Sequence, residues 1–171
     1  MKRNYYLMTV ALVVLALVSL AASPAPEQRN FVAHLSGSEE VPVVATLAQG
    51  QAIFHLSKDG NELHYKLIAS NIENVVQAHI HVGAAGENGP VVAFLYGLVA
   101  PGGGRTEGVL AEGTITAADL IGPLAGKPLS ALVDAMRSGG AYVNAHTNDG
   151  IDPPNTGAGD VATGEIRGQI H

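Results

Sequence analysis

Apolar and polar residues alternate along most of the chain after residue 30, the pattern typical of half-buried β-strands. This alternation predicts strands at residues 31–36, 51–57, 63–69, around 79–81, 91–95, 109–116, 141–147 and 164–171. An Asp59-Gly60 turn between the second and third of these favours a β-hairpin. Short strands separated by glycine-rich turns predict an all-β fold, a Greek-key β-sandwich or barrel.

One short connecting helix is predicted at residues 128–138. Its apolar residues fall at i, i+3, i+4 and i+7, namely Leu129, Leu132, Val133 and Met136. Pro128 suits a first helical turn, and Gly139-Gly140 ends the segment. A single helical turn capped by Thr116 is predicted at residues 117–120.

The first 23 residues have a different pattern. Lys2 and Arg3 precede an apolar run over residues 5–20, which small residues follow. This order predicts a secretory signal peptide at 1–23, a linker at 24–30 and one domain at 31–171. The alternative is an uncleaved membrane anchor, since the apolar run is close to the roughly 20 residues needed to span a bilayer. Both interpretations place the domain outside the cytoplasm.

Composition narrows the classes of partner and site. Without Lys2 and Arg3, seven basic residues remain against 15 acidic ones, a net charge of −8. Nucleic-acid binding needs a basic surface, so we expect no nucleic-acid partner. The chain has no cysteine, which excludes disulfides and thiolate metal sites.

Seven histidines lie on the polar sides of the predicted strands. His79 and His81 are separated by one residue, so on a strand both point to the same face, opposite Ala78 and Ile80. Paired imidazoles are ready ligands for copper or zinc, and His146 on a later strand is a candidate third ligand. The alternative for His79 and His81 is a paired surface motif that hydrogen-bonds to the following turn, and for His146 it is a polar network with Asn144. The other four histidines are expected to be ordinary solvent-facing residues.

Two groups of acidic residues are candidate chemical sites. Glu39 and Glu40 are adjacent and face opposite ways on an extended chain, so a loop role is favoured over an acid–base pair. Asp149, Asp152 and Asp160 lie in a polar loop, but their spacing matches no EF-hand. Solvated loop carboxylates are the favoured interpretation.

Five ordered blocks resemble the successive motifs of a CHRD domain, the module first described in chordin. The blocks cover residues 35–42, 78–83, 88–92, 141–147 and 164–170. Chordin binds extracellular growth factors, so the resemblance implies a secreted module with a possible extracellular protein partner. The role of chordin transfers poorly to a chain of one domain, and a non-enzymatic interaction module without metal is one of two predicted functions.

The second predicted function comes from a more distant likeness to the copper half of Cu/Zn superoxide dismutase. His79 and His81 resemble its paired strand ligands, His146 resembles its late-strand ligand, and Arg167 resembles its anion-guiding arginine. The likeness implies copper, superoxide as a small-anion substrate, and no zinc site, since matching zinc ligands and a bridging histidine are missing. A fourth copper ligand would come from the mature N-terminus, water or another histidine, the candidates being His34, His55 and His64.

Overall fold

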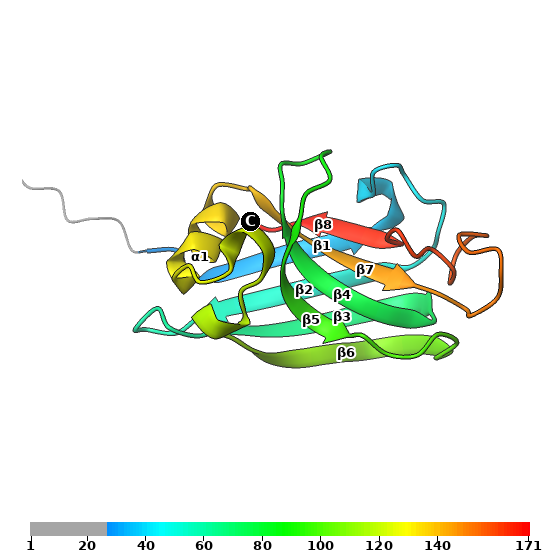
Figure 1. The fold of residues 1–171 in the computed structure, drawn as a ribbon, viewed down its shortest axis with the longest axis horizontal. Coiled ribbons are helices and arrows are strands. Elements are labelled where there is room, and N and C mark those ends of the chain that lie inside the picture. Colours follow the sequence, from blue (N-terminus) through cyan, green and yellow to red (C-terminus); the bar gives the residue numbers. More distant parts are fainter. Residues whose placement is uncertain (1–26) are drawn as a thin grey trace, which may run out of the picture.

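Eight antiparallel strands form a single sheet that curls into a nearly closed barrel (Figure 1) in the computed structural model, which describes residues 27–171. The strands are β1 (Asn30–Ser36), β2 (Gln49–Leu56), β3 (Leu63–Glu73), β4 (Val75–Val82), β5 (Val91–Gly97), β6 (Arg105–Ile115), β7 (Ala141–Thr147) and β8 (Ile166–Gln169). They are hydrogen-bonded in the order β5-β4-β7-β8-β1-β2-β3-β6. The all-β prediction is therefore confirmed.

The barrel closes where the two end strands of the sheet, β5 and β6, approach each other. No ladder joins them within residues 27–171. Instead, the hydroxyl of Tyr65 on β3 donates a hydrogen bond to the carbonyl of Leu95 on β5, at 2.8 Å. The last strand, β8, lies in the middle of the sheet between β7 and β1.

Period-2 alternation determines which side chains fill the barrel. On β2, the predicted inward residues Ala52, Phe54 and Leu56 are at most 5% exposed. On β4, Ala78 and Ile80 are fully buried in the same apolar core. His79 and His81 therefore project from the outer face of the barrel wall.

Strands β3 and β4 follow each other almost without a break, yet they pair with different neighbours. Asn74 stands alone between them with a φ of 54°, in the left-handed region that asparagine tolerates better than most residues. Its side-chain oxygen accepts from the backbone N–H of Gly104, and its amide nitrogen donates to the carbonyl of Gly159. This corner directs the chain from one half of the barrel to the other.

The predicted helix forms as α1 (Leu129–Arg137) at one end of the barrel (Figure 1). Its four apolar residues at helical spacing are all buried. Three short 3₁₀ helices accompany it: η1 (Gly37–Glu39), η2 (Ala117–Asp119) and η3 (Gly122–Leu124). In η2, Thr116 and Asp119 form a capping box, in agreement with the predicted cap.

Strand limits differ from the sequence prediction where alternation fails. Strand β6 starts at Arg105, four residues earlier than predicted, because bulges in its pairing with β3 interrupt the period of two. The predicted signal peptide at 1–23 and the first part of the linker lie outside the described residues. Within residues 27–171, no helix is long and apolar enough to cross a membrane.

Candidate metal centre

The pairing of β4 with β7 brings the three predicted ligands together. Gln77 lies opposite His146, and His79 lies opposite Asn144, so His79 and His146 are diagonal neighbours on one face. The ring centroid of His79 lies 5.0 Å from the ring centroid of His146 and 5.6 Å from that of His81. One ring nitrogen of each histidine lies within 4.8 Å of the other two.

This face of the sheet is covered by loops. His79 is 4% exposed, His146 is 8% exposed and His81 is 9% exposed. The loop after β4 carries Gly89 over His81, and the loop after β7 carries Ala162 over His146. The three histidines are therefore buried, and His81 makes the hydrogen bond to the following turn that one alternative predicted.

Hydrogen bonds from the loops select the tautomer of two rings. Nδ1 of His81 donates to the carbonyl of Gly89 at 2.8 Å, and Nδ1 of His146 donates to the carbonyl of Ala162 at 3.0 Å. A carbonyl only accepts, so each Nδ1 carries the proton and each Nε2 keeps its lone pair. Among the described residues, three buried ring nitrogens have no partner: Nδ1 of His79, Nε2 of His81 and Nε2 of His146.

Burial keeps the three imidazoles neutral. The pKa of His79 is lowered to about 4, mainly by burial and then by the neighbouring His146 and His81. Burial is also the main cause that lowers the pKa of His146 and of His81, and the positive charge of Arg167 lowers that of His81 further. Neutral imidazole is the form that binds metals, so these residues are ready ligands at ordinary pH.

The cluster fits a metal ion with three nitrogen ligands. Metal–nitrogen bonds of about 2.0–2.1 Å would need the three nitrogens within roughly 4 Å of one another. The ligand nitrogens of the cluster lie within 4.8 Å of one another, so small rotations of the rings would bring them to the distances that a metal ion needs. Three buried ring nitrogens without hydrogen-bond partners are costly unless something binds them, and a metal could take all three as ligands.

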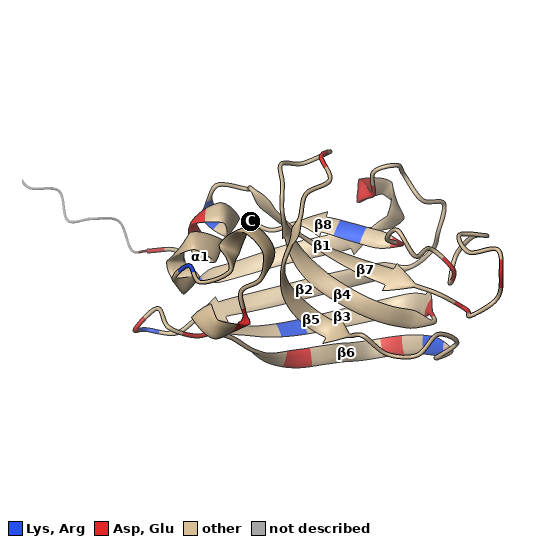
Figure 2. Cartoon of the chain, viewed as in Figure 1, with Lys and Arg blue, Asp and Glu red and all other residues tan. Residues whose placement is uncertain are grey.

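Arg167, the predicted anion guide, lies one aromatic ring away from the histidines. It is the basic residue on β8 (Figure 2), and its guanidinium is 3.5 Å from the ring centroid of Tyr142. The Tyr142 ring in turn stacks on His81, with centroids 4.8 Å apart. Arg167 is 1% exposed and donates to the carbonyls of Ala84 and Glu87. Its role toward an anion stays a prediction.

Two buried carboxylates beside this region were not predicted as site residues. Nδ2 of Asn144 donates to both carboxylate oxygens of Glu40, at 2.8 and 3.0 Å. Burial raises the pKa of Glu40 to about 7 although Arg167 opposes the shift. Glu165 accepts from the hydroxyls of Thr46 and Thr147. Glu40 precedes no strand and follows no periodic pattern, so the sequence holds no signal for its burial.

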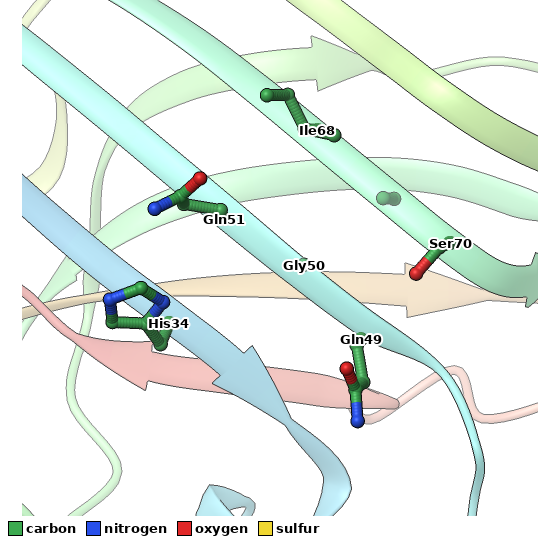
Figure 3. Close-up of a pocket in the computed structure, with 7 residues that line it drawn as sticks. His34, Gln49, Gly50, Gln51, Ile68 and Ser70 are labelled. Carbon is green, nitrogen blue, oxygen red and sulfur yellow. The ribbon is translucent and has the colours of Figure 1, made fainter.

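The other candidate ligands remain outside the cluster. His55 bonds to Asn30 and His64 bonds to Thr114, both on the exposed outer face of β1–β3 and β6. His34 lines a shallow surface hollow of about 290 Å³ (Figure 3). In the described part of the chain, none of the three joins the cluster as a fourth ligand.

Comparison with protein families covers the three clustered histidines. The CHRD domain profile matches residues 31–153. The chain belongs to the CHRD domain family. The CHRD match spans β1 to β7 and includes all three clustered histidines, whereas β8 and Arg167 lie beyond it. A comparison with curated proteins found no match.

Proposed function

We propose that this CHRD domain binds copper through Nδ1 of His79, Nε2 of His81 and Nε2 of His146. Two observations carry the proposal. One ring nitrogen of each histidine lies within 4.8 Å of the other two. The three nitrogens named above are buried and have no hydrogen-bond partner among residues 27–171. The carbonyls of Gly89 and Ala162 would act as outer supports, because they orient two of the rings.

The donor set supports copper. The cluster contains no carboxylate, the ligand type that Mg²⁺ and Ca²⁺ require, and the chain contains no thiolate. Among divalent first-row ions, Cu²⁺ binds nitrogen sites most tightly. Copper would supply one-electron redox chemistry. The chain's own residues would bind the ion, fix the ring orientations and keep bulk water away from it.

An extracytoplasmic location belongs to this proposal. The predicted signal peptide at 1–23 and membership of a family named for a module of secreted chordin support it. A protein there meets copper that intracellular thiols do not sequester, and the domain has no cysteine that copper could oxidise.

Superoxide dismutation is a narrower prediction for the same site. This prediction assigns Arg167 the role of attracting the superoxide anion. However, Arg167 is 1% exposed, and its guanidinium already donates hydrogen bonds to two backbone carbonyls and to Asn88. An anion at Arg167 would have to displace these acceptors. A superoxide assay of the copper-loaded domain tests this activity. A dismutation rate no higher than that of the same concentration of copper in buffer without protein would rule the activity out.

Copper binding is tested on the domain that begins at Pro24. Purified protein would be exposed to Cu²⁺, dialysed and examined by elemental analysis and electron paramagnetic resonance. We expect one copper per chain with nitrogen hyperfine structure, and loss of both in the His79→Ala/His81→Ala variant. The matched control is His34→Ala/His55→Ala, which removes two exposed histidines. Equal copper in the two double variants, or a wild type that binds neither Cu(II) nor Cu(I), would contradict the proposal.

A protein-interaction module without metal is the second candidate. It is favoured by exposed apolar side chains beside the histidine cluster, since Leu98 is 75% exposed and Val99 is 38% exposed. Both line a hollow of about 550 Å³ that also contains Gln77, the residue opposite His146. Single exposed apolar residues are common, so this signal is weaker than the buried nitrogens. Capture of an extracellular protein by the metal-free domain, lost in Leu98→Asp, would support this candidate.

A further inference from the structure

The charges around the histidine cluster determine which ion it can hold. Three neutral imidazoles contribute no negative charge, and the cluster is nearly closed to solvent. A cation in such a site is stabilised by lone pairs alone and loses much of its hydration. The penalty for burying charge rises steeply with the charge of the ion, so a monovalent ion is favoured over a divalent one.

Arg167 adds positive charge on one side of this site. Strand β7 lies between β4 and β8, so Tyr142 of β7 has His81 on one side and Arg167 on the other. The buried guanidinium is fixed by hydrogen bonds to the carbonyls of Ala84 and Glu87 and to Oδ1 of Asn88. It cannot turn away from the cluster without breaking them.

Nearby carboxylates cancel this charge at the histidines only in part. Within residues 27–171, Arg167 is the one fixed charge that shifts the pKa of a clustered histidine. Glu40 lies on the far side of Asn144, and burial raises its pKa to about 7, so part of it is uncharged at neutral pH. The carboxylate of Glu165 accepts hydrogen bonds from the hydroxyls of Thr46 and Thr147 and from the N–H of Gly159.

We propose that Arg167, held over Tyr142, makes the three-histidine site select Cu(I) over Cu(II). This inference rests on the proposed copper function and assigns Arg167 a role other than anion guidance. Arg167 is a positioning residue here, because it acts on the ion through space and through the packing of Tyr142 on His81. Binding alone is claimed, and no electron transfer is needed for it.

Coulomb's law gives the size of the effect. One unit charge roughly 10 Å from the ion, at an effective dielectric constant of about 20, changes the ratio of the Cu(II) and Cu(I) dissociation constants roughly tenfold. A tenfold change in that ratio corresponds to about 59 mV in a one-electron reduction potential. The neutral, dehydrated ligand set acts in the same direction.

The test measures both dissociation constants on the wild-type domain by competition with chromophoric chelators, under anaerobic conditions for Cu(I). The variants are Arg167→Gln, which removes the charge, and Arg167→Lys, which keeps it but loses the forked hydrogen bonds. We expect tighter Cu(I) than Cu(II) binding in the wild type, a roughly tenfold smaller ratio in Arg167→Gln, and a ratio near the wild-type value in Arg167→Lys.

Other outcomes separate the inference from the proposal beneath it. Cu(II) bound more tightly than Cu(I), or an equal change of ratio in both variants, would overturn the role of Arg167 while copper binding stands. No binding of either ion would overturn copper binding itself. Should Arg167→Gln fail to fold by circular dichroism, Glu40→Gln at pH 8 replaces it. That variant removes a negative charge beside Arg167 and must raise the ratio of the Cu(II) dissociation constant to the Cu(I) dissociation constant. An unchanged ratio would overturn the inference.

Discussion

Two parts of the barrel's outer surface carry histidines on neighbouring strands, and they differ in how far loops cover the side chains. On β1, β2 and β3, the side chains of His34, His55 and His64 are exposed to solvent. On β4 and β7, His79, His81 and His146 are at most 9% exposed. The strands are built alike, so the difference comes from the loops that cover them.

Coverage by loops converts surface histidines into a candidate site. The loop after β4 contributes the carbonyl of Gly89, and the loop after β7 contributes the carbonyl of Ala162. Each accepts from Nδ1 and leaves Nε2 without a partner. The exposed histidines have side-chain partners instead, Asn30 for His55 and Thr114 for His64. A buried, oriented lone pair is what distinguishes the covered face.

Removing one covered histidine should have the largest effect. His146→Ala leaves two nitrogens of the three, so we expect copper affinity to fall at least ~100-fold, as losing a ligand exceeds the 10–100-fold cost typical of losing an outer support. His64→Ala, on the exposed face, should leave the affinity unchanged. Isothermal titration with copper measures both. Similar affinities in the two variants would remove the distinction between the faces.

Acid should destabilise the metal-free domain through the covered histidines. In the unfolded chain a histidine takes up its proton near pH 6.5, whereas folded His79 stays neutral down to about pH 4. The unfolded state therefore binds more protons between these values, and the free energy of unfolding falls as pH drops from 6.5 to 4. His146 and His81 act in the same direction.

We expect the contribution of His79 to be on the order of 2 kcal/mol. Urea unfolding of wild type and His79→Gln at pH 7.5 and pH 4.5 measures it, with His55→Gln as the exposed control. The wild type should lose more stability than His79→Gln over this range, while His55→Gln should follow the wild type. Parallel losses in all three proteins would show that the folded His79 is not held neutral.

Glu40 provides a prediction with the opposite sign. Its pKa rises from 4.5 to about 7 on folding, so the folded state binds more protons in that window. Its contribution to stability is therefore lost as pH rises from 4.5 to 7. Gln at this position is uncharged and can still accept from Nδ2 of Asn144.

Relative to the wild type, Glu40→Gln should gain roughly 2 kcal/mol in unfolding free energy between pH 4.5 and pH 8. The neighbouring Glu39 is exposed, which makes Glu39→Gln a matched control. Chemical unfolding at the two pH values gives the difference directly. A Glu39→Gln variant that gained as much as Glu40→Gln would argue against a buried, neutral carboxyl.

The smallest expected effect concerns the loop over His81. Nδ2 of Asn88 donates to the carbonyl of Val41 at 2.7 Å, and its Oδ1 accepts from Arg167. Asn88→Ala removes both bonds, and we expect a loss of about 1 kcal/mol in stability. Asn61→Ala in an exposed turn is the control. Hydrogen exchange of residues 83–89 should accelerate in Asn88→Ala, and unchanged exchange would show that Asn88 does not fasten the loop.

Alternation along the sequence is sufficient to predict the strands of the barrel wall and the placement of His79 and His81 on one face of their strand. His79 and His81 share a face because a strand repeats every two residues, and β7 supplies His146 to the same face. The position of β7 beside β4 could not be predicted from a local pattern, since strand order depends on long-range pairing. The burial of the site could not be predicted either, because the loops that cover it show no periodic pattern of apolar and polar residues. The hydrogen-bond acceptors of Arg167 lie in the loop after β4, and Glu40 pairs with Asn144 on a distant strand, so the sequence does not predict the surroundings of either residue.

The most direct test of the account is the state of each histidine nitrogen in solution. Long-range proton–nitrogen correlation spectra of the uniformly ¹⁵N-labelled domain would be recorded without metal and with one equivalent of Cu(I), which is diamagnetic. The account predicts Nδ1-protonated tautomers for His81 and His146 before addition, then large shifts at Nδ1 of His79 and at Nε2 of His81 and His146. The exposed histidines, His34, His55 and His64, should not shift. Shifts at the exposed histidines, or none at the covered ones, would contradict the claim that loop coverage creates a copper site.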